Sequence, residues 1–128
     1  MERAREYLIA LEILAEHLSK SILPPIGLIA SQAIELGLKA FLLNKGWTES
    51  EVKKVGHNLE KLWKEATKAG LRINGEHKFS VDVLSLSHDA PFLFRYPQDK
   101  VAVAITEPAV LCLAVKAIID SVEDKIFE

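Results

Sequence analysis

The sequence predicts an all-α domain, an antiparallel up-and-down bundle of four to five helices. Three observations lead to this fold. Apolar residues recur at spacings of three and four over several long segments, which is typical of helices with one buried face. Helix start and stop signals separate these segments. Most connections between them are short, which favours antiparallel neighbours.

The first two segments predict long helices. The first covers about residues 3–21, with an apolar stripe of Tyr7, Leu11, Leu14, Leu18 and Ile22. The second covers about residues 26–44 and follows Pro24-Pro25, since proline is tolerated in a first turn. It is apolar on nearly all sides, so neighbours should enclose it. A seam of small residues should let another backbone approach closely; it consists of Gly27, Ala30, Ala33, Gly37 and Ala40.

Two shorter helices follow. Thr48 and Glu51 have the spacing of a capping box, which starts a short helix that ends near Gly56. Asn58 is a good N-cap for a helix over residues 59–68. The inner face of this helix is expected to be Leu59, Leu62, Trp63 and Ala66.

The segment 71–105 is ambiguous. Asn74-Gly75 is a turn signal, and Phe79, Val81 and Val83 alternate with polar residues as in a strand, although Leu84 and Leu86 break the alternation. Around residues 92–105 a short irregular or hairpin segment is possible. The final helix is clearer: Thr106 caps it and Pro108 lies in its first turn. Its apolar face is Leu111, Val115, Ile118, Val122 and Ile126.

Composition limits the class of protein. The 128 residues, taken as one domain over 1–128, carry a net charge of −2, which excludes a uniformly basic nucleic-acid-binding protein. One cysteine excludes an internal disulfide and a four-cysteine zinc site, and neither a metal site nor a cofactor is expected. The mixed charge of the N-terminus is unlike a signal peptide, and Glu35 and Lys39 interrupt the most apolar segment. A cytoplasmic location is therefore expected.

Charge is uneven along the chain. Between residues 51 and 78, seven basic residues accompany four acidic ones. Such a run is typical of a solvated face, but it also suits weak binding of a phosphate backbone.

A polar stripe follows one face of the second predicted helix. Ser31, Gln32, Glu35 and Lys39 are the only polar residues between positions 26 and 43, and their spacing places them together. The stripe is either the solvent edge of the helix or part of a groove or partly buried polar network. Periodicity does not separate these two interpretations.

Three motifs resemble the HEPN (higher eukaryote and prokaryote nucleotide-binding) family. Residues 31–43 and then Gly46 resemble its signature helix, in which Gln-Ala, Glu and Leu-Lys-Ala precede a closing glycine. The segment Gly56-His57-Asn58-Leu59 is similar to the family's Thr-His-Asp-Leu, with glycine and asparagine replacing threonine and aspartate. The segment Arg95-Tyr96-Pro97 matches an Arg-Tyr-Pro motif of one branch.

The resemblance implies a helical bundle, commonly a homodimer, often encoded beside a minimal nucleotidyltransferase. The hypothesis is a non-catalytic module that binds a nucleotide or RNA phosphate and acts with such a partner, without a membrane. Its candidate ligand-binding residues are Gln32, Glu35, Lys39, His57, Asn58, Arg95 and Tyr96.

Two alternatives remain open. Other branches of the family are metal-independent, toxin-like ribonucleases that use an arginine and a histidine a few residues apart. Arg72 and His77 have that spacing, but they lie across the predicted turn at Gly75 rather than on a helix. The second alternative is a purely structural dimeric interaction domain without a ligand.

Overall fold

The all-α prediction is confirmed by a computed structural model that describes residues 1–16, 23–88 and 108–127. Within those ranges the chain forms six α-helices and one short 3₁₀ helix, and no strand. The elements are α1 (Glu2–Ala15), α2 (Leu23–Asn44), α3 (Glu49–Val55), α4 (Leu59–Lys68), η2 (Gly75–His77), α5 (Lys78–His88) and α6 (Pro108–Ile126).

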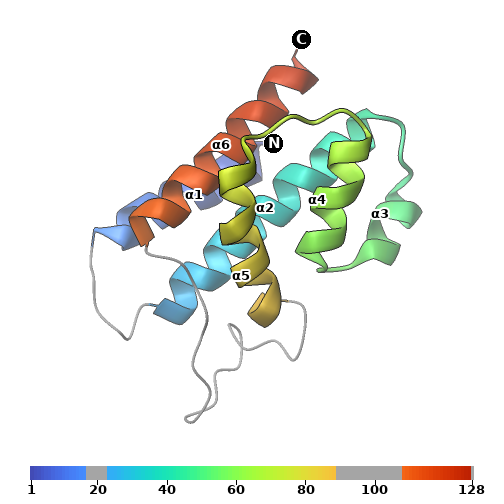
Figure 1. Ribbon diagram of the computed structural model, residues 1–128. Helices are drawn as coiled ribbons and strands as arrows, with labels where there is room; N and C mark the ends of the chain where they lie inside the picture. The colour runs from blue at the N-terminus through green and yellow to red at the C-terminus, as the bar shows by residue number, and fades with distance from the viewer. Residues whose placement is uncertain (17–22, 89–107, 128) are drawn as a thin grey trace.

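Helix α2 is the centre of the bundle. It packs against α1 and α6 on one side and against α4 and α5 on the other, as Figure 1 shows. Its largest core side chain, Phe41, is completely buried. The segment Ile26–Asn44 is long and apolar enough to cross a membrane, but most of it is buried inside the protein. We therefore interpret α2 as a core helix, as the sequence predicts.

Helices α1 and α6 run antiparallel. Near the start of α1, Arg5 donates to Glu123 at 2.6 Å and to Asp120 at 3.0 Å, both near the end of α6. Farther along α1, the charge of Glu12 acts on Cys112 in the first half of α6. The first and last helices thus cover one side of α2 together.

The long helices differ from prediction mainly at their ends. Helix α1 ends at Ala15, earlier than expected, and residues 17–21 of the predicted helix lie outside the described residues, as does Ile22. Its buried residues are Ala4, Leu8 and Leu11, so the inner face is rotated from the predicted stripe. Helix α2 begins at Leu23, which confirms that the proline pair lies in the first turn.

The capping predictions for α3 and α4 are confirmed. The Thr48 hydroxyl accepts from the Glu51 amide at 3.1 Å, while the Glu51 carboxylate accepts from the Thr48 amide at 3.0 Å. The Asn58 side chain accepts from the Lys61 amide at 3.0 Å. The buried face of α4 consists of the predicted Leu59, Leu62, Trp63 and Ala66.

The sequence left residues 79–83 open between a strand and a helix, and in the structure they are helical. These residues belong to helix α5, which buries Ser80, Val81 and Leu84. The spacing of Val81 and Leu84 fits one helix face, and packing against α2 and α4 outweighs the preference of Phe and Val for strands. The segment 92–105 and the cap Thr106 lie outside the described residues.

Helix α6 confirms its predicted apolar face. Leu111, Val115, Ile118 and Val122 are completely buried, and Ile126 packs on the core as a half-buried residue.

Candidate functional site

The polar stripe of α2 is not a solvent edge. Ser31 and Glu35 are buried, with 0% and 4% of their surface exposed. The Ser31 hydroxyl and the Gln32 amide nitrogen are also buried and have no hydrogen-bond partner among the residues that the structure describes. A polar group buried without a partner costs free energy, so this face of α2 is unusual for a core helix. Burial therefore favours the interpretation of the stripe as a partly buried polar network.

Glu35 links two basic side chains. One carboxylate oxygen, Oε2, accepts from Lys39 Nζ at 3.0 Å, and the other, Oε1, lies 2.8 Å from His57 Nδ1. The side chain of Glu35 is 6% exposed, against 19% for Lys39 and 42% for His57. We call these three residues the Glu35 cluster. Its acidic member is inside the protein, and its two basic members reach the surface.

The contact fixes the chemistry of the histidine ring. An ionised carboxylate only accepts hydrogen bonds, so His57 Nδ1 carries a proton. The ring is therefore held in one tautomer and one orientation, as is common where imidazole serves a functional role. Lys39 is held one helical turn from Glu35 and adds a second donor. Lys39 and the oriented imidazole are therefore the two polar groups that the cluster can offer to an anion at its partly exposed edge.

The turn between α3 and α4 positions His57 next to Glu35 of α2. Helix α3 ends at Gly56, whose φ of +66° and ψ of −132° are accessible mainly to glycine. Asn58 then caps α4, which leaves His57 between the turn at Gly56 and the N-terminus of α4. The turn at Gly56 and the cap at Asn58, one on each side of His57, therefore place the imidazole beside Glu35.

The other predicted ligand-binding residues have different positions. Asn58 uses its side-chain oxygen to cap α4. Gln32 lies one turn before Glu35 on α2. Arg95 and Tyr96 lie outside the described residues.

The candidate nuclease pair lies elsewhere. Arg72 follows α4, and its Nη1 donates to the backbone carbonyls of Thr67 at 3.2 Å and Leu71 at 3.3 Å. His77 ends η2, with Nε2 3.9 Å from a carboxylate oxygen of Glu76. In place of the predicted turn at Gly75 the chain forms the 3₁₀ helix η2, which His77 ends, whereas Arg72 lies before it and outside any helix. In this position Arg72 stabilises the C-terminal end of α4 by binding the Thr67 carbonyl.

Comparison with known protein families identifies a HEPN domain over residues 1–124. The chain belongs to the HEPN family. Comparisons with curated proteins and with solved structures gave no significant match. HEPN domains commonly pair with nucleotidyltransferases. Gly56 stands where the family's Thr-His-Asp-Leu segment has threonine. Gly56 has a positive φ in this chain, and a β-branched threonine avoids that conformation.

Sequence reasoning noted the basic run of residues 51–78 but did not predict that three of its lysines surround one hollow. Lys64 and Lys68 of α4 lie with Lys78 of α5 around a hollow between the two helices. The signal that could have found them is the basic run of residues 51–78 combined with the spacing of four between Lys64 and Lys68, which places both on one helix face.

Proposed function

We propose that this HEPN domain is a non-catalytic module that binds the phosphate of a nucleotide or an RNA and acts with a partner protein such as a minimal nucleotidyltransferase. The observation that carries the proposal is the buried Glu35 carboxylate holding Lys39 and His57. Family membership supports it, because HEPN domains commonly pair with nucleotidyltransferases.

The arrangement suits anion binding better than a role in stability alone. Replacing a buried ion pair by apolar residues is often neutral or stabilising, so burial of Glu35 is poorly explained by stability. The cluster instead pre-orients two basic groups, and pre-orientation lowers the entropic cost of holding a ligand. The position of His57 directly before α4 adds the backbone amides of a helix N-terminus to the same region.

The binding test is fluorescence anisotropy with an end-labelled RNA oligonucleotide, with a labelled nucleotide as a second probe. We expect His57→Gln and Lys39→Met to weaken binding by roughly tenfold each, which corresponds to about 1.4 kcal/mol. The matched control is Lys54→Met, which removes the same charge from the exposed face of α3. Equal binding by all four proteins would refute a role for the cluster, and no binding by any of them would favour the purely structural interpretation.

The ribonuclease alternative is tested on the same RNA. Because the Arg72 guanidinium is already bound to the backbone carbonyls of Thr67 and Leu71, we expect no cleavage by the wild type and no change in Arg72→Ala or His77→Ala. Cleavage that either variant abolishes would establish the alternative.

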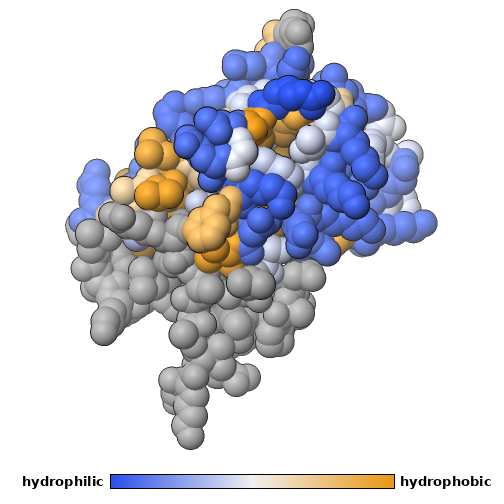
Figure 2. All heavy atoms as spheres, in the orientation of Figure 1, coloured by the Kyte–Doolittle hydropathy of each residue, from blue (hydrophilic) through white to orange (hydrophobic). Residues whose placement is uncertain are grey.

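A homodimer is the expected assembly, and an apolar surface on α1 and α6 supports it. Ile9, Ile13, Val110 and Leu113 are large apolar side chains that are at least 46% exposed. Figure 2 shows hydrophobic atoms gathered on the side where α6 begins. We expect Leu113→Glu to give a monomer by light scattering, whereas Phe79→Glu on α5 leaves a dimer. A wild-type monomer would contradict the assembly.

The partner is tested by co-expression with a nucleotidyltransferase encoded beside this chain. We expect the two proteins to co-elute on size exclusion. Independent elution, or a neighbourhood without such a gene, would contradict this part of the proposal.

A further inference from the structure

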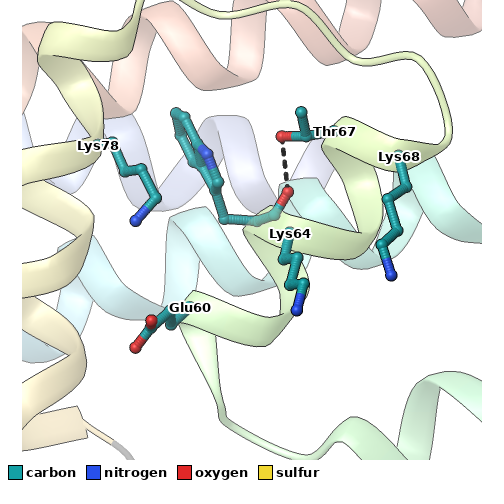
Figure 3. A pocket seen from close by; sticks show the side chains of 6 residues that line it. Glu60, Lys64, Thr67, Lys68 and Lys78 are labelled. Carbon is teal, nitrogen blue, oxygen red and sulfur yellow. Dashed lines mark hydrogen bonds between the residues drawn. The ribbon is translucent and has the colours of Figure 1, made fainter.

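A basic hollow between α4 and α5 has no role in the function proposed above. It is open to solvent, has a volume of about 320 Å³, and is lined by Glu60, Trp63, Lys64, Thr67 and Lys68 of α4 and by Lys78 of α5. None of these residues belongs to the Glu35 cluster. Figure 3 shows Lys78 facing α4 across the hollow, with Glu60 at one end.

The lining has a positive charge. It contains three lysines and one glutamate. Lys64 forms no ion pair among the residues that the structure describes, and Lys68 lies 3.7 Å from Glu65, a long contact. Lys78 pairs with Asp82 at 3.1 Å, but neither Asp82 nor Glu65 lines the hollow. Among the described residues, Lys64 is therefore the lysine of the lining that has no carboxylate partner, and it is the group best placed to bind an anion.

The lining consists of one face of α4 and the first residue of α5. Glu60, Lys64 and Lys68 are spaced by four and lie along the same face of α4. Asn74 caps η2 through the Glu76 amide at 3.1 Å, and the chain then enters α5 at Lys78. The third lysine thus comes from a separate element, which makes the hollow a property of the fold and not of a single helix.

Size and polarity narrow the class of ligand. A volume of about 320 Å³ lies at the lower end of the range of small-molecule sites. Trp63, which is 8% exposed, contributes an apolar wall. The Thr67 hydroxyl donates to the Trp63 carbonyl at 2.8 Å, so its oxygen remains an acceptor. Such a lining suits a molecule with an anionic group, an apolar part and a hydroxyl that donates to Glu60 or Thr67.

We propose that the hollow between α4 and α5 binds a small organic phosphate, with the phosphate between Lys64 and its neighbouring lysines and the organic part against Trp63. Lysine is a common point-charge binder of phosphate. The ligand is either a mononucleotide or a sugar phosphate, since both carry a phosphate and hydroxyls on an organic body. The proposal is independent of the Glu35 cluster, and no reaction is part of it.

The test uses the tryptophan in the wall as a reporter. Trp47 and Trp63 are the two tryptophans of the chain, so Trp47→Phe leaves Trp63 as the only indole. Emission is followed while adenosine monophosphate, glucose 6-phosphate or inorganic phosphate is added. We expect a saturable change with at least one of the organic phosphates, and weaker binding at higher salt.

Matched variants in the same background locate the site. Lys64→Ala should weaken binding by roughly tenfold, the size expected for one charge-assisted contact, and Lys64→Arg should restore most of it because the charge is kept. Lys54→Ala removes a lysine of α3 outside the lining and should leave the affinity unchanged. Circular dichroism checks that each variant is folded.

Three outcomes would overturn the proposal. The first is no saturable change with either organic phosphate. The second is equal binding by the Lys64→Ala and Lys54→Ala variants. The third is binding of inorganic phosphate as tight as that of the organic phosphates, which would indicate an anion site without a place for an organic body. Since the RNA experiment above uses variants of His57 and Lys39, either proposal can fail without the other.

Discussion

Loss of Lys39 should destabilise the domain far more than its position near the surface suggests. At 3.0 Å and an effective dielectric constant of about 20, the attraction between Lys39 and Glu35 is about 5–6 kcal/mol before desolvation. Removing one member of a fully buried pair costs about 3–5 kcal/mol. Because Lys39 is partly exposed and Glu35 also contacts His57, we expect Lys39→Met to cost about 2–3 kcal/mol of unfolding free energy.

A double-mutant cycle separates charge from packing. Glu35→Met removes the buried charge, so its cost should be about 1 kcal/mol, and the double variant Glu35→Met/Lys39→Met should be about as stable as Glu35→Met alone. Urea unfolding followed by circular dichroism measures all four proteins. The exposed Lys54→Met is the control, expected within about 0.5 kcal/mol of wild type. Additive single effects would refute the reasoning, since they would mean that the two side chains are not coupled.

Three further predictions concern the rest of the bundle. Gly37→Ala should stabilise the domain by about 0.5–1 kcal/mol in urea unfolding, because a Cβ there would meet only Ile119 at 3.9 Å; destabilisation would show that α2 and α6 cannot accommodate a methyl group. A hydrogen bond from Lys116 lowers the pKa of Asp120 below its usual value, so this carboxylate stabilises the fold above about pH 3.9 and ceases to do so as pH falls through the lowered pKa. Asp120→Asn should therefore lower the free energy of unfolding by about 0.5–1 kcal/mol at pH 7, a modest figure because the side chain is 41% exposed. At a low pH where the carboxyl is protonated, the same substitution should cost nothing. An equal cost at pH 7 and at low pH would contradict this assignment. Burial raises the pKa of the Cys112 thiol, so Cys112 should react with a disulfide reagent at pH 8 more slowly than a free cysteine does, and more slowly than it does in urea.

Local signals predicted much of the fold. Helix α4 was predictable from its own residues, because its cap Asn58 and its apolar face lie within a dozen positions. Helix α5 was not, because its short apolar pattern fits a strand as well as a helix, and its packing partners α2 and α4 decide between the two.

The candidate site shows the same limit. The spacing of four between Glu35 and Lys39 predicts their contact on any helix. The contact between Glu35 and His57 joins residues 22 positions apart and depends on the turn at Gly56. Burial of Glu35 likewise depends on the elements packed around α2, and hydrophobic periodicity within α2 carries no information about them.

The antiparallel pair of α1 and α6 has a consequence for synthesis on the ribosome. Arg5 finds its carboxylate partners 115 and 118 residues later in the chain. Until the ribosome has released α6, the side of α2 that α1 and α6 cover together is covered by α1 alone, and α2 is the most apolar segment of the chain. The core is therefore complete only after α6 has been synthesised. A chain that ends before α6 would expose apolar surface, tend to aggregate, and become a substrate for chaperones or proteases.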